Sequence, residues 1–316
     1  MGNIMTNMRQ SVTIGRNQTG KRSRQRIATD RIEEKRAVIK RIAGAIVRTI
    51  LVVLLVATPS IVLPETHSDT ALLIALIAVV AAVFTFAEYN SEYPSLVEFR
   101  DAPPFNRIRF VALGITVFAL SLICLGTENP TTLTQLLGST GARLGELIDF
   151  PYSPVRLVLL VLPTDAPAES VTTLRTAAGV AYFFSIVSLA FFVLMVRFNG
   201  WPTKPGGFNV WTNLPTFDPT AGGDIVERLN RDGQINIILG FLLPFIIPAL
   251  VKFASDTFSP ISLESQHTMI WTVTAWAFLP SSLIMRGTAM GRIAQMVEEK
   301  RKRSHEAEEA ENYLPA

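Results

Sequence analysis

The apolar residues of this chain are gathered into long runs that polar segments separate. A helix needs about 20 apolar residues to cross the roughly 30 Å of hydrocarbon in a bilayer. None of the runs carries a lysine, an arginine or a carboxylate near its centre. They predict an all-α polytopic membrane bundle of about six transmembrane helices. The runs are 42–63, 71–87, 108–126, 177–196, 235–253 and 269–285.

The composition excludes an ordinary water-soluble domain. Of the 316 residues, 49% are hydrophobic and 17% are charged, and the mean hydropathy is +0.33. Soluble globular chains carry about 25% charged residues. The chain has a single cysteine, Cys124, which lies within an apolar run. Because there is only one, an intrachain disulfide and a metal cluster made of several thiolates are excluded.

Basic residues gather in alternate connections, and this bias predicts the orientation of the chain. Lysine and arginine near the ends of spans are retained on the cytoplasmic side. The N-terminal segment, the connections 88–107 and 197–234, and the C-terminal segment are basic, whereas the other connections hold many carboxylates. Six spans with both termini in the cytoplasm satisfy this pattern. We expect a multi-pass protein of the plasma membrane or the bacterial inner membrane.

The spans divide the chain into three parts. Residues 1–30 are polar and basic and predict a flexible cytoplasmic tail. Residues 31–290 form the predicted six-span transmembrane domain, which includes an outer loop at 127–174 and an inner loop at 199–234. Residues 291–316 form a charged cytoplasmic tail.

The outer loop contains two apolar segments that we do not expect to span the membrane. Residues 155–162 are too few to cross a bilayer, and prolines flank them, so they lie either at the interface or in a re-entrant turn. Upstream, leucines from Leu133 to Leu147 recur at helical spacing, which predicts an amphipathic helix on the outer surface. A seventh span would move one terminus outside and break the charge bias.

Aromatic residues and prolines are interleaved in the two inner connections. These segments are too aromatic for disordered linkers and too interrupted for spans. Because tryptophan and other aromatic residues dominate binding hot spots, the rings are candidates for docking a partner protein. The alternative is a plug whose rings lie at the level of the lipid headgroups. The candidates are Tyr93, Phe99 and Phe105 in the first connection, and Trp201, Trp211 and Phe217 in the second.

The fifth run contains two prolines, Pro244 and Pro248, four residues apart. Each proline lacks a backbone donor and leaves a carbonyl without its helical partner. In lipid such a carbonyl must find another donor, so these breaks often line cavities or moving parts. We treat the two prolines as hinge candidates, and the alternative is a kink that serves packing alone.

Two histidines, His67 and His267, are predicted at the outer ends of spans, with Glu65, Asp69 and Glu264 close in sequence. Imidazole and carboxylate groups together can bind a transition metal, or can titrate as the pH falls below about 6.5. The two histidines are therefore the metal-ligand candidates of the chain. The alternative is that they are ordinary polar residues beside span ends.

No motif of an enzyme occurs in the sequence, which has no P-loop, no HExxH pair, no Gly-x-Ser-x-Gly elbow and no CxxC pair. We assign no catalytic residue, no cofactor and no nucleic-acid partner. The lack of charges deep in the spans argues against ion transport. We expect a non-catalytic accessory, scaffold or assembly subunit of a larger membrane complex, which binds membrane-protein partners through its cytoplasmic loops and tails. The alternative is a small transporter or channel for a neutral solute, and a membrane-embedded enzyme ranks third.

Overall fold

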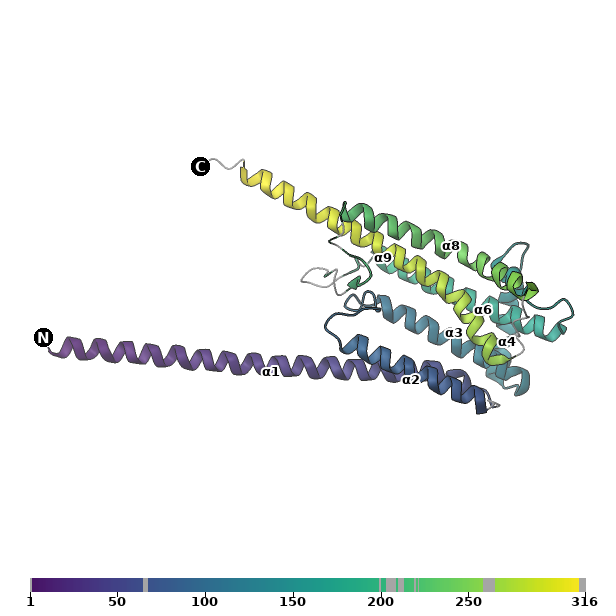
Figure 1. Ribbon diagram of the computed structural model, residues 1–316, viewed down its shortest axis with the longest axis horizontal. Helices are drawn as coiled ribbons and strands as arrows, with labels where there is room; N and C mark the ends of the chain where they lie inside the picture. The colour runs from purple at the N-terminus through teal and green to yellow at the C-terminus, as the bar shows by residue number, and fades with distance from the viewer. Residues whose placement is uncertain are drawn as a thin grey trace.

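The computed structural model is a bundle of long helices that run side by side (Figure 1). No strand occurs among the residues that it describes. For residues 2–30, 68, 256, 311 and 312 it describes the backbone alone. The described residues are 2–64, 68–198, 200–202, 209, 213–218, 220, 222–257 and 265–312.

Among the described residues, six helices are long and apolar enough to span a membrane, and each overlaps one of the predicted apolar runs. The predicted all-α fold with six membrane helices is confirmed. Two shorter helices lie in the connection between the third and fourth of these spans. The spanning helices are α1 (Gly2–Val62), α2 (Ser68–Asn90), α3 (Phe105–Glu128), α6 (Ala168–Phe198), α8 (Ile225–Thr257) and α9 (Gln266–Asn312), and the shorter ones are α4 (Thr132–Ile148) and α5 (Pro154–Leu159).

The first and last helices extend beyond their apolar runs. Helix α1 begins at Gly2, within the segment predicted as a flexible tail, and the flexibility of that segment stays a prediction. Helix α9 continues through the predicted charged tail to Asn312. Two ion pairs at helical spacing, Glu298 with Lys302 and Glu299 with Arg303, support this extension of α9.

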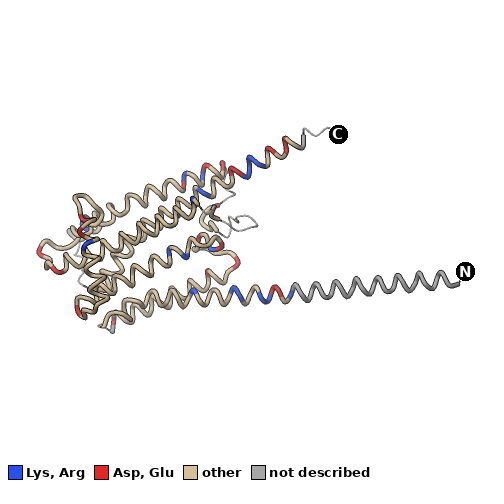
Figure 2. The backbone as a smooth tube through the Cα atoms, turned by 180° about the vertical axis from the view of Figure 1, so that it is seen from behind, with Lys and Arg blue, Asp and Glu red and all other residues tan. Residues whose placement is uncertain are grey.

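Both termini lie on the same side of the bundle (Figure 1), as an even number of spans requires. We call this side the terminal side and the opposite one the far side. Figure 2 shows that lysine and arginine are more numerous toward the terminal side, whereas aspartate and glutamate prevail at the far end. The distribution agrees with a cytoplasmic terminal side, which stays a prediction.

Helix α9 packs against α8, α6 and α3. Glycines allow the backbones of α8 and α9 to approach closely. A Cβ atom built on Gly240 of α8 would lie 2.6 Å from the carbonyl oxygen of Pro280, and one built on Gly233 would lie 3.0 Å from the carbonyl oxygen of Gly287. Small residues at such contacts are typical of membrane bundles, where van der Waals packing drives helix association.

The predicted amphipathic helix of the outer loop is α4, and it packs closely against α6. A Cβ atom built on Gly179 of α6 would lie 2.5 Å from the Cα atom of Gly145 of α4. A Cβ atom built on Gly141, one turn earlier on α4, would lie 2.8 Å from a methyl carbon of the Val180 side chain. The sequence signal for this contact is the pair of glycines four residues apart.

The helix in the apolar segment 155–162, α5, has only 6 residues and is too short to cross a bilayer. That residues 155–162 are interfacial or re-entrant stays a prediction. Val155 is fully buried where α5 packs against α6 and α8. Asp149, which follows α4, forms ion pairs with Arg156 of α5 at 2.6 Å and with Arg175 of α6 at 2.9 Å. The Asp149 side chain is only 5% exposed, so one carboxylate joins three helices on the far side.

Helices α1 and α2 form an antiparallel hairpin at the edge of the bundle. Helix α2 packs mainly against α1, and α1 in turn contacts α3. The outer surface of α2 exposes apolar side chains such as Leu72 and Val83. Lipid can cover this surface because its side chains are apolar and the backbone N–H and C=O groups of a helix are hydrogen-bonded to one another.

Candidate functional site

The two connections on the terminal side fold together around one aromatic cluster. Phe99 precedes α3 and Phe105 begins it, Phe192 belongs to α6, and Trp201 follows α6. Ring centroids lie 4.5 Å apart for Phe99 and Phe105, 5.6 Å for Phe99 and Trp201, and 5.4 Å for Phe105 and Phe192. Each side chain is at most 1% exposed. We call the described residues of 91–104 and 200–224 the terminal platform.

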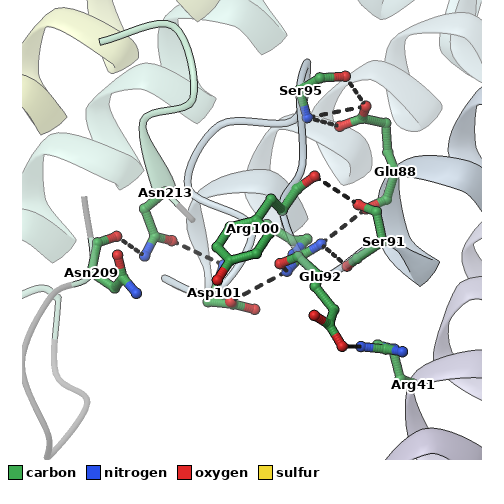
Figure 3. A network of polar contacts seen from close by, with 10 residues as sticks. Arg41, Glu88, Ser91, Glu92, Ser95, Arg100, Asp101, Asn209 and Asn213 are labelled. Atoms are coloured by element: carbon green, nitrogen blue, oxygen red, sulfur yellow. Dashed lines mark hydrogen bonds and ion pairs between the residues drawn. The ribbon is translucent and has the colours of Figure 1, made fainter. Parts of the chain in front are cut away.

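A buried carboxylate at the end of α2 binds the backbone of the first connection. Glu88 is 8% exposed. It accepts hydrogen bonds from the backbone N–H groups of Ser95, Leu96 and Val97 at 3.0, 2.9 and 3.1 Å. Figure 3 shows the contact with Ser95. Three donors that belong to no helix or strand are thereby paired with a charged acceptor. The chain after α2 is therefore held close to the helix that it has just left.

Arg100 also stabilises this connection through hydrogen bonds to backbone carbonyls. Its guanidinium donates hydrogen bonds to the carbonyl oxygens of Glu88, Ser91 and Glu92 at 3.0, 2.7 and 3.0 Å (Figure 3). A guanidinium offers five donors in one plane and can bind several carbonyls at once. The Arg100 side chain is only 10% exposed. One carboxylate and one guanidinium thus close residues 88–100 into a compact loop.

Asn213 joins the second connection to the first. Its backbone carbonyl accepts a hydrogen bond from the N–H of Phe99 at 2.6 Å, and its side-chain oxygen accepts one from the N–H of Asp101 at 3.0 Å. Figure 3 shows Asn213 facing Asp101. The indole N–H of Trp201 donates to the carbonyl of Ala102 at 3.2 Å in a buried position. Directional bonds as well as apolar packing therefore hold the two connections together.

Helix α9 carries two ion pairs that bind the platform. The guanidinium of Arg286 donates to both carboxylate oxygens of Glu98, and Nη2 lies 2.8 Å from Oε1. Farther along, Arg301 binds the carboxylate of Asp224 at 2.9 and 3.1 Å. Hydrogen bonds from Arg301 lower the pKa of Asp224 below its usual value of 3.8. The Arg286 pair is largely buried, whereas the Arg301 pair is exposed and stabilises less.

The predicted docking residues take different positions in the platform. Tyr93 is 72% exposed, and Trp211 lies outside the described residues. Leu96, an aliphatic residue that the aromatic pattern did not single out, is 65% exposed on the same loop. The docking role of these residues stays a prediction, and Tyr93 and Leu96 are large apolar side chains that the described loop exposes. The other four rings are at most 5% exposed and hold the platform together: Phe99, Phe105, Trp201 and Phe217.

The two prolines predicted as a hinge lie inside α8, which continues through both. Pro248 has no N–H for the carbonyl four residues earlier, that of Pro244. The indole N–H of Trp276 on α9 donates to this carbonyl at 3.0 Å in a buried position. Tyr182 of α6 stacks on the same indole, with ring centroids 5.7 Å apart. These contacts favour a fixed kink, and hinge motion stays a prediction.

Of the two metal-ligand candidates, His67 lies outside the described residues, and His267 is 9% exposed in the first turn of α9. Across the described part of the chain, no three His, Cys, Asp or Glu side chains form a group that could hold a metal ion. A cavity of about 150 Å³ lies nearby on the far side, between Cys124 and Gln266. Sites for organic ligands typically measure about 300–1,000 Å³.

Six apolar helices with an ordered loop platform on the side of both termini define a multi-pass α-helical integral membrane protein. No protein-family model matches the chain, and neither a curated protein nor a solved structure matches it. The geometry of the terminal platform is therefore the basis for a functional assignment.

Proposed function

We propose that this chain is a non-catalytic membrane subunit that scaffolds or assembles a larger membrane complex. The observation that carries the proposal is the terminal platform, in which irregular backbone is ordered by a buried aromatic cluster and by ion pairs to α9. Ordering one residue costs roughly 1–2 kcal/mol of backbone entropy, and connections that only joined spans would not need it. A rigid surface loses less entropy when a partner binds.

The terminal side is where we place the partner. Tyr93 and Leu96 are exposed on a loop that Glu88 and Arg100 hold rigid. Tyrosine is enriched at protein interfaces because its ring has a large apolar area and its hydroxyl forms hydrogen bonds. Helices α1 and α9 extend beyond the bundle on the same side and offer charged surface next to this loop (Figure 2).

The test is gentle detergent extraction, followed by sizing and mass spectrometry of the proteins that come along. We expect stoichiometric partners with the natural chain, and their loss when Tyr93 and Leu96 are both replaced by serine. The matched control is Tyr152→Ser, because Tyr152 is 86% exposed on the far side. Trp211→Ala extends the test to the second connection. A lone monodisperse protein, or full retention of the partners by the double variant, would contradict the proposal.

Cysteine labelling tests the orientation, with the terminal side in the cytoplasm of a plasma or bacterial inner membrane. We expect a cysteine at Ser304, near the end of α9, to be labelled from the cytoplasm. A cysteine at Asp165, between α5 and α6, should be labelled from outside. Both are introduced into a Cys124→Ala background. Labelling of both positions from one side would overturn the six-span topology.

Transport of a neutral solute is the second candidate, because Pro244 and Pro248 interrupt the backbone hydrogen bonds of α8. The bond from Trp276 to the Pro244 carbonyl gives this kink a packing role, and it favours the subunit proposal. Swelling of vesicles in glycerol distinguishes the two functions. Swelling that depends on the purified chain and changes with Trp276→Phe would favour transport.

A further inference from the structure

A guanidinium on the exposed surface of α1 has no acidic partner among the residues that the structure describes. Arg48 belongs to the apolar run 42–63, and its neighbours Val47 and Leu51 are 56% and 43% exposed. No carboxylate of the described residues forms an ion pair with Arg48. Arginine stays protonated in proteins. A permanent positive charge therefore faces the lipid.

The Arg48 side chain runs back along α1 toward the terminal side. Its Nη1 atom donates a hydrogen bond to the carbonyl oxygen of Gly44, one turn earlier, at 2.7 Å. Side chains on a helix lean toward its N-terminus, and long cationic chains reach for the interface in this way. Arg48 follows Ile42, the start of the apolar run, by less than two turns, or roughly 9 Å. The charge therefore lies close to the level at which lipid headgroups begin.

Gly44 makes room for this guanidinium. A Cβ atom built on Gly44 would lie 2.8 Å from Nη1 of Arg48, closer than real Cβ contacts. The two atoms found within 4 Å of that position both belong to Arg48. Glycine is less favourable than alanine inside a helix. Because Gly44 has no side chain, the Arg48 guanidinium can occupy the space beside its Cα atom.

The ring of Tyr89, on α2, also contacts the Arg48 guanidinium. The central carbon of the Arg48 guanidinium lies 4.6 Å from the Tyr89 ring centroid, in a cation–π contact. Two other arginines near the terminal side bind groups of the protein itself. Arg100 donates to three carbonyls, and Arg109 donates to the hydroxyl of Ser282. Arg48 is exposed beside the apolar surface of α1, where a lipid headgroup can reach it.

We propose that Gly44, Arg48 and Tyr89 form a binding site for the phosphate headgroup of a phospholipid in the leaflet on the terminal side. Arg48 donates charge-assisted hydrogen bonds to the phosphate oxygens. The Tyr89 ring flanks the guanidinium, and its hydroxyl donates a hydrogen bond to the same phosphate. The acyl chains lie along the exposed apolar surface of the α1–α2 hairpin. A lipid supplies the phosphate because the site opens toward the bilayer, and an anionic lipid adds a favourable net charge.

Native mass spectrometry of the full-length protein in detergent, titrated with phosphatidylglycerol, tests the site. We expect Arg48→Gln to bind one phosphatidylglycerol about tenfold more weakly than the natural chain, which is the effect of losing one charge-assisted hydrogen bond. Gly44→Val should weaken the same binding, because its side chain displaces the guanidinium while the charge remains. Arg31→Gln is the matched control, since Arg31 is exposed on α1 outside the apolar run. It should bind like the natural chain.

Equal affinity of the natural chain and Arg48→Gln for phosphatidylglycerol would overturn the site. If Arg48→Gln fails to fold, Gly44→Val decides, and natural affinity in that variant would equally overturn it. Glycerophosphoglycerol, which is phosphatidylglycerol without its acyl chains, is the second probe. We expect it to compete at least tenfold more weakly than the lipid, because it lacks the apolar contacts. Competition as strong as that of the lipid would assign the site to a soluble phosphate and contradict the lipid assignment.

Discussion

Replacing Gly145 with alanine tests the close contact between α4 and α6. A Cβ atom at Gly145 would lie 2.7 Å from the carbonyl oxygen of Arg175 and 3.1 Å from its carbonyl carbon. Both atoms belong to the backbone of α6 and cannot rotate aside. Ordinary contact begins near 3.4 Å, so α4 must move away by about 0.7 Å, enough to forfeit a quarter to a half of the dispersion energy of the surrounding contacts.

Overpacking of this kind costs about 1–3 kcal/mol. Alanine also favours a helix over glycine by up to about 1 kcal/mol, which partly masks the cost. Gly138→Ala is the matched control on the same helix, because no atom lies within 4 Å of its Cβ position. The comparison of the two variants largely removes the propensity effect. We expect Gly145→Ala to unfold with a free energy about 1–3 kcal/mol below that of Gly138→Ala.

Cys124 supplies the assay. It is the single cysteine of the chain and is 1% exposed, in the core next to α4 and α6. A thiol-reactive fluorophore therefore labels it as the bundle unfolds on heating in detergent. At roughly 2–4 °C per kcal/mol, the labelling midpoint of Gly145→Ala should lie several degrees below that of Gly138→Ala. Equal midpoints would refute the reasoning that the two backbones touch.

Three further changes test single contacts. Trp276→Phe removes the donor to the Pro244 carbonyl, and the labelling midpoint should fall by the cost of a buried unpaired acceptor, about 1–3 kcal/mol. Asp149→Asn removes the negative charge that pairs with two arginines on the far side. Breaking a fully buried ion pair costs about 3–5 kcal/mol of stability. Because both arginines are partly exposed and can rehydrate, we expect the free energy of unfolding to fall by less, about 1–3 kcal/mol, in the same assay. The lowered pKa of Asp224 means that its contact with Arg301 stabilises the folded state above pH 3.8 and is lost as the pH falls through the lower folded pKa. The anisotropy of a fluorescent probe on the C-terminal tail should fall with it, and Asp224→Asn should abolish that pH dependence.

The spans can be predicted from the apolar runs, because a run of about 20 residues has the same meaning whatever packs beside it. Because each span carries the chain to the opposite side of the membrane, the order of the runs also predicts which connections share a side. Two local signals in the sequence also mark positions that the structure uses. The glycine pair Gly141 and Gly145 marks the approach of α4 to α6, and Pro248 marks the carbonyl that lacks a helical partner.

The identity of the partner in each contact depends on residues that are distant in sequence. Trp276 reaches the Pro244 carbonyl only because α8 and α9 pack side by side. Phe99 and Trp201 have the composition of a docking surface, yet they lie in the interior of the platform, whereas Tyr93 on the same loop is exposed. An aromatic residue in a loop has the same sequence signal in both positions, because burial is a property of the packed chain and not of the side chain.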